Sequence, residues 1–214
     1  MGTVANNPGS LQELMRYATS LDPAQSAQLV GKQSIGETKW DTITFAAGAL
    51  APQLPFFSAQ TSELALKNFD GNGYLVGAGK FFLAQTIGLK IVGVGPATTG
   101  ANVIDFVNRC AIRLQVDNKI MGTFPVHQLT GFGGVFAPSQ VAPTVAANPP
   151  GGVASTALEN GVPQNLPFKI PPMLLEGQKA FAAFLLAPTT TPITLADILT
   201  VKFLVGGIQF QAIQ

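Results

Sequence analysis

The chain has 214 residues, of which 47% are hydrophobic and only 11% are charged, whereas an ordinary soluble domain has about 25% charged residues. This length suits one large domain with a hydrophobic core, and the shortage of charge suggests that part of the surface is covered in use. Proteins that coat nucleic acid usually have an excess of basic residues or a basic arm. This chain has a net charge of +1 and no basic arm, so it lacks that signature. One cysteine excludes an intrachain disulfide, and no apolar run reaches the ~18 residues needed to span a bilayer.

Residues 1–35 are predicted to form an N-terminal arm that contains a helix over about residues 10–21. Ser10 and Glu13 have the spacing of a capping box. Apolar side chains then recur at helical intervals on one stripe, which consists of Leu11, Leu14, Met15, Ala18 and Leu21. Two interpretations remain open. The helix packs on its own domain, or it docks on a neighbouring subunit, and Leu14 is then a candidate interface residue.

From Thr38 onward the hydrophobic pattern has a period of two, which predicts β-strands. In the first strand Trp40 and Thr44 alternate with Ile43 and Phe45. Residues 53–59 form a short apolar segment with a proline, and this predicts a strand near a sheet edge. Residues 80–95 are rich in β-forming residues and are expected to be interrupted at Gly88.

A hairpin is the clearest β-signal of the sequence. Two strands are predicted at about residues 109–116 and 119–127, with Ile112 and Leu114 on one face and Arg113 on the other. The Asp117-Asn118 pair between them tolerates the positive φ that a two-residue hairpin turn needs.

The segment of residues 137–167 is rich in proline and is predicted to be a long loop without regular structure, laid over a surface. Three further strands follow it, within residues 166–170, 179–187 and 201–213. Many strands between Gly/Pro turns, without βαβ alternation, predict an all-β chain that forms an antiparallel sandwich or barrel.

Residues 180–187 form an apolar run without a polar atom in any side chain. On a strand, Phe181 faces one side, while Phe184 and Leu186 face the other. Neither side suits water, so one of them is expected to meet a lid or another subunit. Phe181, Phe184 and Leu186 are therefore candidate interface residues.

No pattern in the sequence predicts catalytic, cofactor-binding or metal-binding residues. His127 is the only histidine, which excludes a metal site with several histidines in one chain. Cys110 lies next to a predicted strand and is expected to be buried and inert. Residues 69–80 resemble both a calcium loop and a phosphate loop, but required positions are wrong, because Phe81 replaces the last calcium ligand and the phosphate-loop hydroxyl. With dispersed carboxylates as well, we do not expect an enzyme.

The order of segments resembles the jelly-roll capsid proteins of icosahedral bacteriophages, especially tailless ones with an internal membrane. The resemblance is one of organisation, carried by "ITFAAGALAPQLPFF", "GLKIVGVG", "AIRLQVDNKIMGTFPV", "LPFKIPPMLLEGQKAFAAFLLAP" and "VKFLVGGIQFQAIQ". It implies a single eight-stranded jelly roll over residues 36–214 and a virion structural protein, assembled in the host cytoplasm. The implied partners are copies of the same chain, in trimers, pentamers or pseudo-hexamers, and other capsid proteins. The arm departs from small-genome capsid proteins, because Arg16 and Lys32 are its only basic residues before Glu37.

Two alternatives remain at this point. One is a minor virion role, as a spike base, penton or decoration protein. The other is a β-sandwich module that binds a carbohydrate or a protein ligand. Sugar sites usually present exposed Trp and Tyr side chains, and one Trp with two Tyr weakens this second interpretation.

Overall fold

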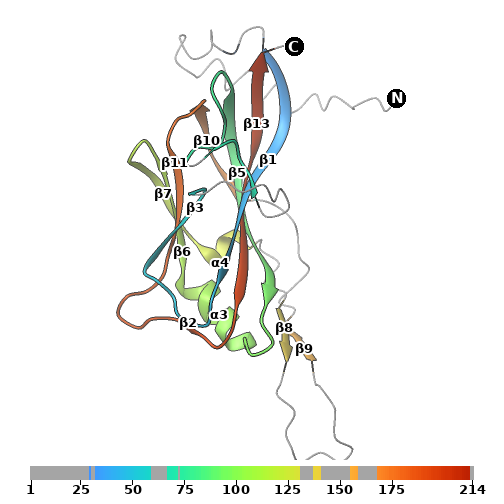
Figure 1. Ribbon diagram of the computed structural model, residues 1–214, viewed down its shortest axis with the longest axis vertical. Coiled ribbons are helices and arrows are strands. Elements are labelled where there is room, and N and C mark those ends of the chain that lie inside the picture. The colour runs from blue at the N-terminus through green and yellow to red at the C-terminus, as the bar shows by residue number, and fades with distance from the viewer. Residues whose placement is uncertain are drawn as a thin grey trace, which may run out of the picture.

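The computed structural model describes residues 29, 32–58, 67–71, 73–130, 137–140, 155–158 and 168–212. Its described part is built mainly from antiparallel strands, most of them in two larger sheets that face each other (Figure 1). The prediction of an all-β, sandwich-like chain is therefore confirmed. The predicted helix at residues 10–21, and Leu14 with it, lies outside the described residues.

One sheet has five strands in the order β10-β5-β13-β1-β4. Its members are β1 (Lys32–Phe45), β4 (Lys67–Asn68), β5 (Phe81–Val94), β10 (Phe168–Glu176) and β13 (Leu199–Ala212). β1 and β13 pair along their whole length, and β5 pairs with β13 on its other side. β5 continues through Gly88, so the expected interruption there is wrong. Gly88 stands opposite Leu204 within the ladder, and continuous pairing with β13 carries the strand through it.

The second sheet has four strands in the order β3-β11-β6-β7. Its members are β3 (Gln53–Phe56), β6 (Ala111–Val116), β7 (Lys119–Pro125) and β11 (Phe181–Leu186). β6 and β7 form the predicted hairpin, and Asp117 and Asn118 adopt positive φ angles of 45° and 67° at its turn. β3 lies at the sheet edge, as its proline predicted.

Four short strands lie outside the two larger sheets. β2 (Gly48–Ala49) pairs with β12 (Thr194–Leu195). β8 (Ala137–Gln140) pairs with β9 (Ser155–Leu158), below the sandwich in Figure 1. The prediction that residues 137–167 lack regular structure is thus wrong for these two strands. Pro138 lies within β8 and stands opposite Ala157, because a strand that pairs on one side only can accommodate a residue without an N–H.

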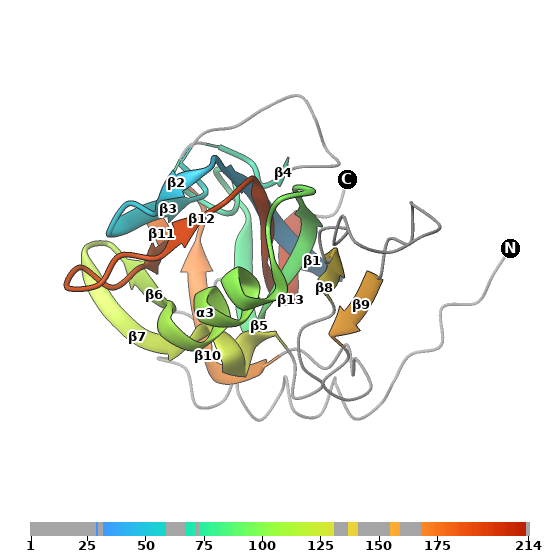
Figure 2. The same ribbon diagram turned by 90° about the horizontal axis from the view of Figure 1, so that it is seen from below.

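Two helices that the sequence analysis did not predict close the lower end of the sandwich (Figure 2). α3 (Gly100–Arg109) begins after Thr99, which forms a capping box with Asn102. Its buried residues Val103, Phe106 and Val107 have helical spacing, a signal that was readable in the sequence. α4 (Val126–Leu129) follows β7 directly and buries Val126 and Leu129.

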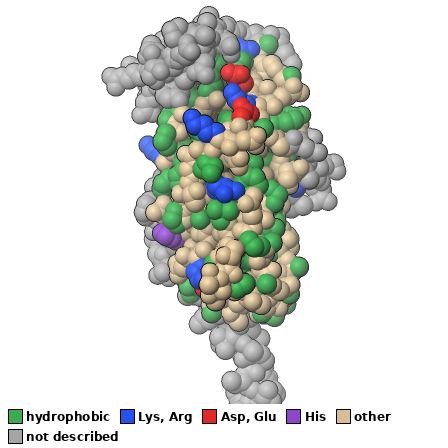
Figure 3. Space-filling view, turned by 90° about the vertical axis from the view of Figure 1, so that its left-hand side faces the viewer, with side chains coloured by type: hydrophobic (Ala, Val, Ile, Leu, Met, Phe, Trp, Pro, Cys, Tyr) green, Lys and Arg blue, Asp and Glu red, His purple; other side chains and the backbone are tan. Residues whose placement is uncertain are grey.

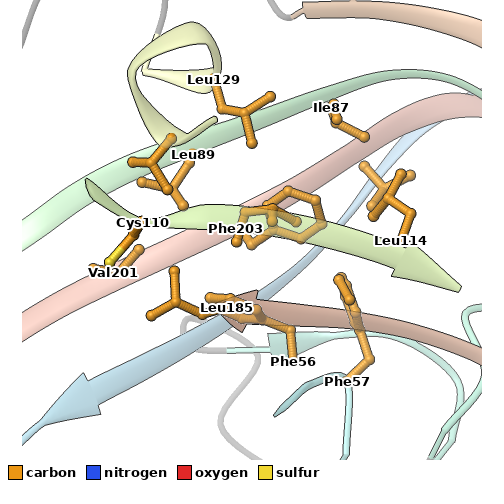
Figure 4. Close-up of a cluster of buried hydrophobic side chains, with 14 of the residues drawn as sticks. Phe56, Phe57, Ile87, Leu89, Cys110, Leu114, Leu129, Leu185, Val201 and Phe203 are labelled. Carbon is orange, nitrogen blue, oxygen red and sulfur yellow. The ribbon is translucent and has the colours of Figure 1, made fainter. Parts of the chain in front are cut away.

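The core fills the space between the two sheets (Figure 4). Phe57 is at its centre, with its ring 5.3 Å from Phe69, 5.6 Å from Phe181 and 6.1 Å from Phe203, measured between centroids. Burial of each such side chain stabilises the fold by roughly 1.5–3 kcal/mol. These side chains come from distant parts of the chain, so the core joins the two sheets into one unit.

Candidate functional site

Strand β11 separates the apolar run at residues 180–187 into two faces. Phe181, Ala183 and Leu185 point into the core, where Phe181 is only 1% exposed. Ala182, Phe184 and Leu186 point outward and are half-buried. Phe181 therefore belongs to the core. Its prediction as an interface residue is wrong, because a partner cannot reach a side chain that is buried in this fold. Phe184 and Leu186 remain candidates.

The neighbouring strands extend the apolar surface around Phe184. The ladder places Pro55 of β3 and Arg113 of β6 directly opposite Phe184. On β7, Gly122 stands opposite the buried Leu114, and a register shift then places Ile120 opposite Gln115, on the outward side. We define the outer face of the four-stranded sheet by six residues: Pro55, Arg113, Ile120, Met121, Phe184 and Leu186.

This outer face combines exposed apolar groups with one charge. Ile120 is 57% exposed and Met121 is 44% exposed. Of the six defining residues only Arg113 is charged. Figure 3 views the molecule from this side and shows hydrophobic side chains spread among a few charged ones. Such a surface favours contact with another macromolecule, since covering apolar area is stabilising.

Ile120 and Met121 were not predicted as interface residues from the sequence pattern. Strict alternation along β7 places them on opposite faces, and only the register shift between Leu114 and Gln115 in the β6–β7 pair changes this. The adjacent pair of large apolar residues just after a hairpin turn was the available signal.

Cys110 is buried between α3 and β6, as expected. Burial, together with the nearby Asp105 carboxylate, raises the pKa of its thiol to about 12 against a smaller opposing effect of Arg109. The reactive thiolate is therefore scarce at neutral pH. His127 lies in α4, where the Thr130 hydroxyl donates to its backbone carbonyl.

We expect Cys110 to be unreactive toward a thiol reagent such as DTNB in the folded protein at pH 8. After denaturation one thiol per chain should react rapidly, because the unfolded residue is accessible and has an ordinary pKa. Absorbance at 412 nm with and without denaturant measures both states. Rapid labelling of folded protein would contradict the buried position.

The segment that resembles a calcium loop instead contains an ion-pair cluster. The Lys80 ammonium lies 2.7 Å from Asp70 Oδ2, and the Gly77 N–H donates to the same oxygen at 2.9 Å. The buried Lys39 ammonium lies 3.2 Å from Asp70 Oδ1 and 2.9 Å from Glu37 Oε1. Asp70 is thus surrounded by donors, and its oxygens join the 70–80 segment to β1.

Partial burial alone raises the pKa of Asp70. The bonds from Lys80 and Gly77 and the charge of Lys39 outweigh it, so the pKa lies below the ordinary 3.8. A carboxyl with a lowered folded-state pKa stabilises the fold above its unfolded-state pKa, and this stabilisation is lost as pH falls through the folded-state value.

We therefore expect the melting temperature to be steady near neutral pH and to fall below about pH 4. Asp70→Asn should lower it at pH 7 and flatten this acid dependence, because the variant has no carboxyl to protonate at this position. Circular dichroism melts from pH 3 to 7 measure both effects. Parallel curves for the two proteins would show that Asp70 does not contribute.

Comparison with known proteins does not identify a family: neither the protein-family models nor the curated proteins contain a match to this chain. Within the described ranges, no group of three or more His, Cys, Asp or Glu side chains is arranged to hold a metal ion. No helix in that part of the chain is long and apolar enough to cross a membrane.

Proposed function

We propose that the protein is a virion structural protein, a capsid subunit that self-assembles into an icosahedral shell and has no catalytic role. The outer face of the four-stranded sheet carries this proposal. Its exposed apolar groups, with Arg113 as the only charge among the defining residues, resemble an interface more than a surface adapted to water. The low charge of the whole chain, 11%, agrees with a protein that is covered by copies of itself.

The pairing of the strands supports a single jelly roll as the finer description of the sandwich. The main strands in chain order are β1, β3, β5, β6, β7, β10, β11 and β13. Among them the first pairs with the last, β1 with β13, and the second pairs with the seventh, β3 with β11. The third pairs with the sixth, β5 with β10, and the two middle strands form the β6–β7 hairpin. This nested pairing is that of a long hairpin rolled into two sheets, an architecture shared by viral capsid domains, lectins and cupins.

Fold alone does not decide among those functions, so the surface carries the functional argument. Trp40, the only tryptophan, is half-buried, and the Lys202 ammonium lies 5.4 Å from its ring centroid. A ring covered in this way does not offer a sugar a flat stacking surface. The assembly function is therefore preferred to a carbohydrate-binding module.

Light scattering on the purified protein over a concentration series tests the proposal. We expect a discrete oligomer or a shell-sized particle whose mass is a multiple of 22.3 kDa. Association should persist at high salt, because apolar burial depends little on screening. A monomer at every concentration would overturn the proposal of a self-assembling subunit.

A further inference from the structure

Arg113 holds an unusual position at the centre of the outer face. It lies on β6 between Phe184 of β11 and Thr123 of β7. Its guanidinium carbon is 5.3 Å from the Phe184 ring centroid, and Nη2 donates to Gln53 Oε1 at 3.0 Å. The Nε atom is buried without a hydrogen-bond partner. None of the ion pairs between described residues includes Arg113.

This environment orients the Arg113 guanidinium so that it can bind a carboxylate. Its planar set of N–H donors matches the two oxygens of a carboxylate, and stacking on Phe184 fixes the plane. A buried N–H without an acceptor costs about 1–3 kcal/mol. If only apolar groups covered the face, more of the Arg113 N–H groups would be buried without an acceptor. The surface that covers Arg113 is therefore expected to supply a carboxylate.

The same face of a second copy does not meet this requirement. A two-fold contact places one patch against itself, and none of the six residues that define the outer face is acidic. Two guanidinium groups would then share one apolar interface without a counter-charge, which is strongly unfavourable. The outer face is instead expected to meet a different surface of the next copy, in a head-to-tail arrangement of the kind that forms rings when its rotation closes.

Among the described residues, Glu176 is the carboxylate that is available for this contact. The other described carboxylates each accept from a Lys, an Arg or a backbone N–H, and they are Glu37, Asp41, Asp70, Asp105, Asp117 and Asp197. Among described residues only the Glu176 side chain has no such contact. It is the last residue of β10, which is an edge strand of the five-stranded sheet and is therefore open to a neighbour on one side.

We propose that Arg113 binds the Glu176 carboxylate of a neighbouring copy, so that the outer face of one subunit packs on the β10 edge of the next. This inference rests on the proposed self-association and specifies its contact. The apolar residues of the outer face supply most of the buried area, and the ion pair sets the orientation, because charge complementarity at an interface discriminates between alternative registers.

Charge reversal tests the pairing. Arg113→Glu and Glu176→Arg should each weaken association about tenfold or more, the change produced by ~1.4 kcal/mol. Combining the two substitutions recreates the pair with opposite polarity and should restore most of the affinity. Light scattering or sedimentation across a concentration series gives the dissociation constants, and thermal melts confirm that each variant is folded. Lys90→Glu, an exposed change on β5 beyond the residues that pair with β10, serves as the charge-matched control and should associate normally.

The outcomes separate this inference from the proposed function. Wild-type association that Glu176→Arg leaves unchanged overturns the pairing while the capsid proposal stands. A double variant as impaired as the single variants also overturns it. If Arg113→Glu does not fold, Glu176→Arg alone still tests the pairing. This variant is expected to fold, because Glu176 is outside the core. A wild-type protein that stays monomeric overturns the proposed function and this inference together.

Discussion

Phe184→Asp is expected to yield a folded subunit that no longer associates, whereas Phe181→Asp should yield no folded subunit. Phe181 is 1% exposed and packs against Phe57. Loss of such a ring costs about 3–5 kcal/mol even when alanine replaces it, and a buried carboxylate adds a large desolvation penalty. A domain with roughly 5–15 kcal/mol of total stability does not tolerate that sum.

Phe184 differs because it is half-buried on the outer face. Aspartate there keeps its hydration in the free subunit, so the fold survives with a smaller loss. In the assembled state the carboxylate would be desolvated against apolar groups, and it would also occupy Arg113 within its own subunit. Circular dichroism measures folding, and light scattering measures association.

The control for this pair is Thr38→Asp, which adds the same charge at an exposed position of β1 and should associate as the wild type does. Leu186→Asp, on the same side of β11 as Phe184, should reproduce the Phe184→Asp result. If Phe184→Asp also unfolds the protein, the outward side of β11 is part of the folded core, and the assembly surface must be sought elsewhere.

Asp41→Ala is expected to destabilise the subunit by about 3–5 kcal/mol, the usual result of removing one partner from a buried ion pair. Asp41 points into the sandwich and is 1% exposed. Its Oδ2 accepts from the Phe57 N–H at 2.6 Å, and its Oδ1 lies 3.3 Å from the Lys67 ammonium. The carboxylate therefore links three segments of chain around the aromatic core.

The hydrogen bond from the Phe57 N–H to Asp41 also holds Phe57 in an unfavourable backbone conformation. The residue has φ = 61°, a left-handed conformation that costs a bulky side chain about 1–3 kcal/mol and persists only where surrounding contacts enforce it. Without the Asp41 acceptor, the Phe57 N–H is orphaned and the central ring loses its backbone anchor. Denaturant unfolding followed by circular dichroism measures the difference in the free energy of unfolding.

Thr38→Ala on the same strand provides the reference, since an exposed substitution usually changes stability by no more than ~0.5 kcal/mol. Asp41→Asn should lie between the two, because it retains an oxygen for the Phe57 N–H but loses the charge that faces Lys67. Stability of Asp41→Ala close to that of Thr38→Ala would show that the buried carboxylate is dispensable.

Local patterns predicted the β-structure well where a single side-chain period governed a segment. The alternation of Ile112 and Leu114 with Arg113 placed the first two inside and the third outside, as the structure has them. α3 was not predicted because strand patterns dominate the segments on both sides of it, although its capping box and apolar spacing are present in the sequence. The β8–β9 pair was missed because no side-chain pattern marks it.

The charged residues of β1 show where sequence patterns fail. Lys39 and Asp41 alternate with Trp40 and Thr42 and share their face with Ile43 and Phe45, so the pattern puts two charges on an apolar face and does not show what neutralises them. In the fold both charges point inward and are buried, because partners from residues 57–80 neutralise them there. A period of two shows which residues share a face, but it does not show which face is covered.

The sequence by itself determined the all-β class, the hairpin at Asp117-Asn118 and the presence of a strand that is apolar on both sides, because these depend on neighbours along the chain. Only the tertiary structure decided which side of that strand joins the core and that Arg113 lies on Phe184. The register shift that brings Ile120 and Met121 to the outer face was likewise decided there. Each of these depends on residues brought together across sheets, where packing and the pairing of buried charges select one arrangement from several that the local pattern allows.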